Sequence, residues 1–113
     1  MNLNKKGAQP KFRILFVDDS INKFITKLEK GSIAKVLKTI DLLEKFNFKL
    51  GLPHSKKIDK KLFELRVYGR QKIRIFYIFQ GEDIILLHIF IKKTTKIPAR
   101  ELKVINTKLQ KLN

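Results

Sequence analysis

The chain has 113 residues, of which 43% are hydrophobic, and its 26 Lys and Arg side chains outnumber 10 Asp and Glu, giving a net charge of +16. This apolar content suits one core and is too high for a disordered polycation, so we expect one domain over residues 1–113, with residues 1–11 as a candidate flexible segment. No apolar run approaches the ~20 residues of a membrane span, and the absence of cysteine excludes disulfides, thiolate metal sites and cysteine nucleophiles.

The first half of the chain predicts one strand followed by two helices. Residues 12–17 are β-branched and aromatic, which is typical of a strand. Apolar residues then recur at helical spacing over residues 21–28, after three candidate N-cap side chains at 18–20, and we expect this helix to end at Gly31. Ser32 can cap a second helix, which would pack antiparallel to the first across one tight turn.

The middle of the chain predicts a connector and then three antiparallel strands. The Gly-Leu-Pro segment at 51–53 ends the second helix, and residues 54–61 form a polar, lysine-rich connector. Apolar and polar residues alternate over 62–68, and extended β-type runs follow at 72–80 and 84–93. Short turns join the three runs, so we expect an antiparallel meander.

A last helix is predicted after Pro98, with Glu101 in its first turn and an apolar stripe along the rest. The stripe consists of Leu102, Ile105, Leu109 and Leu112. The predicted order is therefore β-α-α-β-β-β-α. This order predicts a small α/β domain of the α+β kind, in which an antiparallel meander packs on helices.

The positive charge is concentrated in the middle of the chain. Residues 1–48 carry a net charge of +5, whereas residues 49–100 carry +9. A coding bias toward lysine could raise the charge without selection for binding, but a field of this sign attracts polyanions, and we expect nucleic acid as the partner. A membrane surface is disfavoured because the basic residues are not segregated on one amphipathic helix. Without a secretory signal, we expect a cytoplasmic protein.

One face of the predicted meander is nearly all apolar, because residues of equal parity on a strand share a face. That face should pack on the helices and leave the opposite face open, including the even-numbered residues of 84–92. Cations there could bind RNA phosphates and stabilise the charge that grows on a phosphoryl group when a ribose 2′-OH attacks it, without a metal. Alternatively, Arg66 and Arg74 only form ion pairs with Glu64. The ionisable residues of this face are Glu64, Arg66, Arg74, His88 and Lys92.

Two histidines and the end of the last strand allow more than one interpretation. His88 is either an acid/base group or a hydrogen-bonded core residue. His54 has no partner at a metal-ligand spacing, so we expect neither a metal site nor a cofactor. If the strand stays regular through residue 93, Lys92 and Lys93 point to opposite faces of the sheet.

Three segments resemble a known family signature: Glu64-Leu65-Arg66, then Arg74-Ile75-Phe76-Tyr77, then residues 87–98 with Glu101. The third contains the run Phe-x-Lys-Lys-Thr-x-Lys-x-Pro, which neither composition nor strand alternation demands. Over roughly residues 12–112 the chain is similar to the phage-derived, HigB-like branch of the RelE superfamily, the toxins of type II toxin–antitoxin pairs.

The resemblance implies a ribosome-dependent endoribonuclease, or mRNA interferase, that cleaves messenger RNA in the decoding site and so inhibits translation. It implies the ribosome, messenger RNA and a cognate helix-turn-helix antitoxin as partners, with operator DNA bound only through the antitoxin. It assigns Arg66 and Arg74 to the scissile phosphate and Lys92 and Lys93 to the basic end of the last strand. Many members place a Tyr or His near the C-terminus, whereas this chain has neither after His88.

The residues and the resemblance together give three groups of candidate site residues. The expected catalytic residues are Arg66, Arg74 and Lys92. The expected RNA-binding residues are Lys56, Lys57, Lys60, Lys61, Phe90, Lys93 and Lys96. The candidate acid/base groups are His88 and Glu64. The alternative function is a noncatalytic RNA- or ribosome-binding module that uses the same basic face, because binding needs the cations whereas cleavage also needs proton transfer.

Overall fold

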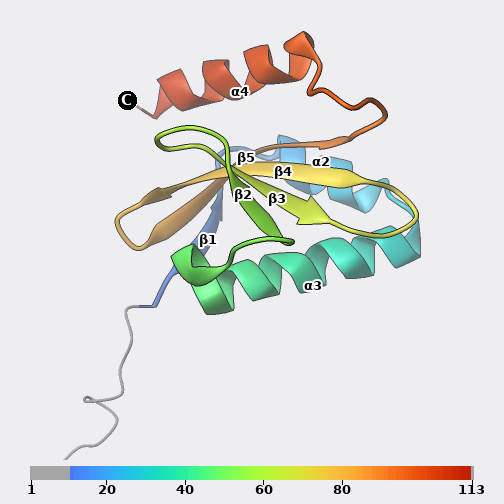
Figure 1. The fold of residues 1–113 in the computed structure, drawn as a ribbon, viewed down its shortest axis with the longest axis horizontal. Helices are drawn as coiled ribbons and strands as arrows, with labels where there is room; N and C mark the ends of the chain where they lie inside the picture. Colours follow the sequence, from blue (N-terminus) through green and yellow to red (C-terminus); the bar gives the residue numbers. More distant parts are fainter. Residues whose placement is uncertain (1–10, 113) are drawn as a thin grey trace, which may run out of the picture.

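A five-stranded sheet forms the middle layer of the computed structural model, which describes residues 11–112 (Figure 1). The strands lie in the order β1-β5-β4-β3-β2, with β1 parallel to β5 and every other pair antiparallel. Their bounds are β1 Arg13–Phe16, β2 Ser55–Lys57, β3 Phe63–Val67, β4 Ile73–Gln80 and β5 Asp83–Ile91. The α+β class and the meander are confirmed, whereas β2 lies in the segment that we expected to be a connector. We expected residues 1–11 to be flexible, and apart from Lys11 these residues lie outside the described part of the chain.

The helices are α2 (Ser20–Thr26), α3 (Lys30–Phe46) and α4 (Ala99–Lys111), with a short 3-10 turn, η1 (Asn47–Lys49), after α3. Gly31 does not end the first helix, and Ser32 does not cap the second. Helix α2 ends at Thr26, and Glu29, the residue before α3, is extended at φ −61° and ψ 150°, so Gly31 lies in the first turn of α3. Ser32 is buried, and its hydroxyl donates to the side chain of Gln71 at 2.7 Å. Within the described stretch, no helix has the length and apolar character to cross a membrane.

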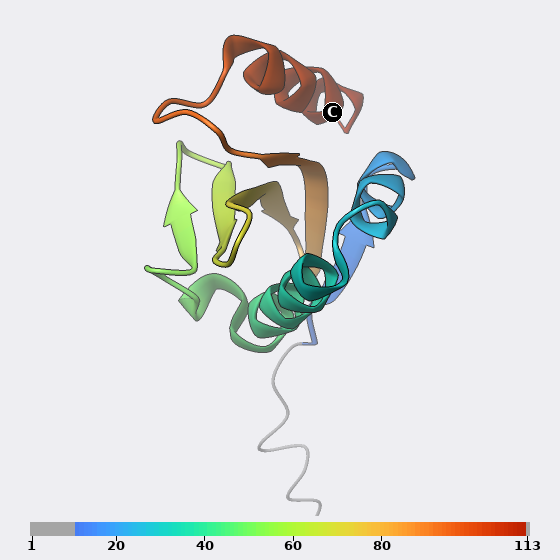
Figure 2. The same cartoon turned by 90° about the vertical axis from the view of Figure 1, so that its right-hand side faces the viewer.

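Helices α2 and α3 cover one face of the sheet, as the apolar parity of the strands predicts (Figure 2). Ile21 and Ile25 of α2 and Val36 of α3 are buried against the sheet. The strand residues of this core are Leu65, Val67, Ile73, Ile75, Tyr77, Ile84, Leu86 and Ile89. The large buried β-branched and aromatic side chains make this layer the main core.

Helix α4 covers part of the opposite face, which we expected to be open (Figure 1). Ile105 is fully buried there, and Leu109 and Leu112 pack beside it, whereas Leu102 stays exposed. The other buried residues of this second core are Leu62, Phe76, Ile78, Ile85, Leu87 and Phe90. The apolar stripe of α4 needs such a surface to bury, and the sequence supplies one on this face as well.

A register shift in β5 changes which face of the sheet its residues occupy. Phe76 of β4 lies opposite His88, but the next residue, Tyr77, lies opposite Leu86, so Leu87 is the extra residue of a β-bulge. Before the bulge, Ile84 and Leu86 face α2 and α3, which corrects their expected placement beside His88. The bulge restores the expected parity for the second half of β5.

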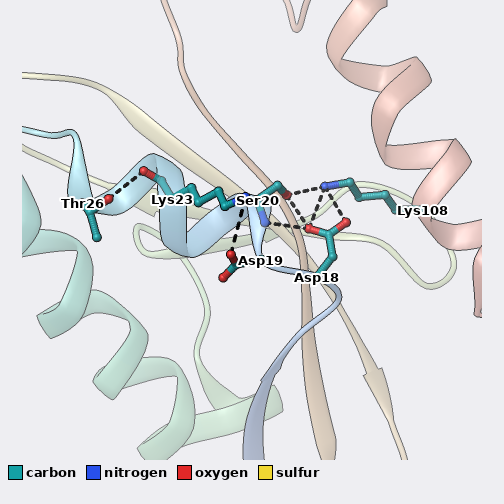
Figure 3. A network of polar contacts seen from close by, with 6 residues as sticks. All are labelled: Asp18, Asp19, Ser20, Lys23, Thr26 and Lys108. Carbon is teal, nitrogen blue, oxygen red and sulfur yellow. Dashed lines mark hydrogen bonds and ion pairs between the residues drawn. The ribbon is translucent and has the colours of Figure 1, made fainter.

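A polar network joins the start of α2 to α4 (Figure 3). The carboxylate of Asp18 accepts hydrogen bonds from the hydroxyl and the backbone N–H of Ser20, the latter at 2.9 Å. The largely buried amino group of Lys108 lies 3.2 Å from Asp18 Oδ2 and donates to Ser20 Oγ at 2.6 Å. The hydrogen bonds from Ser20, and then the Lys108 cation, lower the pKa of Asp18 from 3.8 to about 2. This network fastens α4 to the body of the domain.

We expect Asp18→Asn to lower the free energy of unfolding at pH 7 by about 1–2 kcal/mol, because it removes a charged hydrogen-bond acceptor facing Lys108. Since folding lowers the pKa of Asp18, its stabilising contribution is present above pH 3.8 and is lost as the pH falls toward about 2. Urea titrations from pH 7 to pH 2 measure it. The wild-type protein and the variant should converge at the acidic end, and a constant difference would contradict the linkage.

Candidate functional site

A buried carboxylate on β3 brings the two predicted catalytic arginines together. Glu64 is 2% exposed on the face that α4 partly covers. Its Oε1 accepts a hydrogen bond from Nε of Arg66 at 2.9 Å, and its Oε2 lies 3.7 Å from Nε of Arg74. The hydrogen bond to Glu64 raises the pKa of Arg66. The buried Glu64 carboxylate therefore positions both arginines.

Arg74 is more buried than the sequence predicted, at 7% exposed. Its Nη1 donates to the carbonyl of Ile73 at 3.2 Å, and its guanidinium carbon lies 6.0 Å from the centre of the Tyr68 ring. Its Nε has no hydrogen-bond partner within residues 11–112. This nitrogen is buried and faces Oε2 of Glu64, so its charge serves the ion pair with that carboxylate and not an anion from outside.

Four cations border a surface hollow of about 310 Å³ at the end of the sheet where β4 begins and β5 ends. We call it the basic hollow; it is lined by Lys72, Arg74, Lys92, Lys93, Thr94 and Thr95. The backbone N–H of Lys92 donates to the carbonyl of Lys72 at 2.7 Å, and β5 ends one residue earlier, at Ile91. The strand does not continue through residue 93, which was the condition for Lys92 and Lys93 to point to opposite faces. Both lysines instead border the hollow.

His88 is tied to α4. Its Nε2 lies 2.6 Å from Oε1 of Glu101, in the first turn of that helix, and both side chains are largely buried. The His88 ring stacks on Phe90, with centroids 5.8 Å apart and planes 26° apart. The pair anchors the loop that carries Lys92, Lys93 and Lys96, because Glu101 lies at the far end of that loop.

Phe90 lies in the core beneath α4, where it is 4% exposed and stacks on Phe76 at 5.9 Å. Its ring is covered, so we no longer assign it to base stacking. Sequence parity placed Phe90 on the correct face but could not show that a helix covers that part of the face.

The remaining predicted RNA-binding lysines do not gather at the basic hollow. Lys56 and Lys57 are exposed on the edge strand β2, and Lys60 and Lys61 lie on the loop that follows it. Lys96 is exposed on the loop between β5 and α4. Only this last lysine belongs to a segment that borders the hollow.

Three residues of the site were missing from the sequence-based assignment. Lys72 lines the basic hollow, Tyr68 faces Arg74, and Glu101 binds His88. Lys72 has the same strand parity as Arg74, and Tyr68 has the same parity as Arg66. This parity could have placed both residues on the face of the site. The contact of Glu101 depends on where α4 docks, for which the sequence holds no local signal.

The arrangement suits an anion of the size of a phosphate. Fixed cations around a small hollow attract a phosphoryl group and favour any state in which its charge increases. Across the part of the chain that the structure describes, no three His, Asp or Glu side chains are grouped so as to hold a metal ion.

A protein-family model described as "Phage derived protein Gp49-like (DUF891)" matches residues 23–110 of the chain. The match includes Glu64, both arginines, His88, Glu101 and the whole basic hollow. No curated protein gives a significant match.

We expect Glu64→Gln to lower the free energy of unfolding by about 3–5 kcal/mol, because it leaves two arginines, one of them buried, without their counter-charge. Asp83→Asn is the matched control, because it breaks the more exposed pair with Arg13 and should cost less than about 1 kcal/mol. Chemical denaturation measures both. Equal losses would show that Glu64 does not hold the arginines.

Proposed function

This chain belongs to the Gp49-like family of phage-derived proteins, and we propose that it is the HigB-like toxin of a type II toxin–antitoxin pair, an endoribonuclease that cleaves messenger RNA on the ribosome. The observation that carries the proposal is the basic hollow, where Arg74 and three lysines surround a space that fits a phosphate. Arg66 lies beside Arg74 on the same buried carboxylate.

The proposed reaction is attack of a ribose 2′-OH on the adjacent phosphate, which needs no group from outside the RNA except proton carriers. Negative charge grows on the phosphoryl oxygens as the new P–O bond forms. Arg74, Lys92 and Lys93 would stabilise this charge, and they are already in place before the RNA arrives. Glu64 positions the arginines, since its two oxygens face them.

Proton transfer is assigned to His88. The 2′-OH must lose a proton and the leaving 5′ oxygen must gain one. Glu101 binds Nε2 of His88, so Nδ1 is the ring nitrogen that would exchange a proton with RNA, and Glu101 would orient the ring. Glu64 is a weaker candidate for this role because both of its oxygens face arginines.

A noncatalytic RNA- or ribosome-binding module is the second candidate function, and one observation favours it. Both candidate acid/base groups, Glu64 and His88, are engaged by other side chains of the protein. Binding needs only the cations, which the net charge of +16 supplies in excess.

The proposed toxin would act in the cytoplasm on the ribosome and its messenger RNA, and a cognate helix-turn-helix antitoxin would neutralise it. The net charge of +16 supports both kinds of partner, because it attracts ribosomal RNA and an acidic protein alike. Operator DNA would be bound through the antitoxin alone.

We expect brief expression of this chain alone to arrest growth, and co-expression of a small adjacent gene to restore it. Primer extension on translated messages should show new 5′ ends within codons. Normal growth at confirmed expression of folded protein would contradict a toxin, and arrest without new ends would favour the noncatalytic module.

We expect Lys92→Ala and Lys93→Ala each to lower single-turnover cleavage on saturated ribosomes by about 10²-fold, as is typical for the loss of one transition-state donor. Arg74→Ala should also lower stability, because Arg74 is buried. Lys38→Ala, on the exposed side of α3, is the control and should change neither quantity. Weaker ribosome binding with an unchanged cleavage step would assign these cations to binding alone.

A further inference from the structure

A groove of about 730 Å³ lies at the opposite end of the sheet from the basic hollow. It is formed where β3 begins and β4 ends, and the last turns of α4 make one wall. Its apolar residues are Phe63, Ile78, Phe79, Leu109 and Leu112. In Figure 1 the loop between β2 and β3 reaches toward the C-terminal end of α4, on the far side from the loop that joins β5 to α4.

The polar rim of this groove is a turn that the structure holds in place. The Asp59 carboxylate accepts the backbone N–H groups of Lys61 and Leu62 at 3.2 and 3.1 Å. Leu62 is buried in the core beneath α4 and anchors the turn. The exposed side chains of Lys60 and Lys61 therefore border an apolar groove from a fixed backbone.

This combination of surfaces restricts what can occupy the groove. A second copy of the chain is disfavoured, because it would bring another +16 charge to a basic rim. RNA needs exposed stacking rings or grouped phosphate ligands, whereas both aromatic rings of the groove are already engaged, since Phe63 stacks on Tyr77 and Phe79 packs edge-on against Phe63. Apolar side chains flanked by carboxylates fit both the floor and the rim.

We propose that the groove, with Lys60 and Lys61 at its rim, is the docking site for an acidic, amphipathic segment of the protein that neutralises this chain. The identity of that partner rests on the proposed function, whereas the peptide chemistry rests on the groove alone. Lys60 and Lys61 then serve protein binding in place of the RNA binding that the sequence suggested. Because Lys72 and Gln80 lie at opposite ends of β4, the docked segment would leave the basic hollow uncovered.

The first test uses a synthetic peptide of about 16 residues with Leu at i, i+3, i+4 and i+7 and Glu elsewhere. Titrated into ¹⁵N-labelled protein at physiological salt, it should shift the amide signals of groove residues and leave those of Lys72, Lys92 and Lys93 unchanged. A scrambled peptide of equal charge should bind at least about tenfold more weakly. Equal binding of the scrambled peptide, or shifts centred on the basic hollow, would overturn the proposal.

Variants of the rim and the wall extend this test with matched controls. Lys60→Glu/Lys61→Glu should weaken peptide binding at least about tenfold, whereas Lys38→Glu/Lys45→Glu on α3 makes the same change in net charge and should not. Leu112→Ser should weaken binding, whereas Leu102→Ser, at an exposed position of α4 outside the groove, should not. If an RNA oligonucleotide loses affinity with these groove variants and the peptide does not, the groove binds RNA and the proposal is wrong.

Co-expression separates this inference from the proposed function. Leu112→Ser, which changes only the apolar wall of the groove, should still arrest growth, because the basic hollow is intact, but the adjacent gene should no longer restore it. Arrest that the adjacent gene relieves as well as in the wild-type protein would overturn the docking site alone. If neither protein arrests growth, the proposed function fails, and the peptide titration still decides the groove.

Discussion

Two arginines share one carboxylate that water barely reaches, and the geometry of the site follows from this sharing. Removing Glu64 from water costs free energy that only close cations can offset, so Arg66 and Arg74 are drawn to one place on the sheet. One carboxylate cannot neutralise two guanidinium groups, and a net positive charge remains at the site. Arg74 carries that excess to the wall of the basic hollow, where an anion from outside can complete the balance.

The bulge at Leu87 lets the sheet support this site while it is covered on both faces. β5 lies between β1 and β4 and supplies side chains to both cores, and a perfectly regular strand would have turned His88 toward α2 and α3. The extra residue brings His88 and Phe90 to the side of the arginines. His88 and Phe90 also contact or pack beneath α4, so helix packing and the candidate chemistry use the same surface of the sheet.

The sequence predicted the parts of the fold that depend on local periodicity. Parity placed Glu64, Arg66 and Arg74 on one face, and helical spacing located α2, α3 and α4. The bulge was not predictable, because residues 84–87 are all Ile or Leu and fit either face. The start of α3 was misplaced because Gly31 is tolerated in a first turn, where it makes no side-chain demand. The side on which α4 docks, and hence the burial of Phe90 and the His88–Glu101 contact, depends on tertiary packing.

The two polar anchors of α4 also fix where along the sheet this helix sits. Glu101 and Lys108 are seven residues apart, about two turns, so they lie on nearly the same side of α4. Their partners lie in different elements, His88 within β5 and Asp18 between β1 and α2. Apolar contacts alone would tolerate a slide of one turn, since Leu109 could take the place of Ile105. Such a slide would separate the Glu101 carboxylate from His88 and the Lys108 ammonium group from Asp18. The two ion pairs therefore fix the position of α4 along the sheet. The helix docks in this register or does not dock.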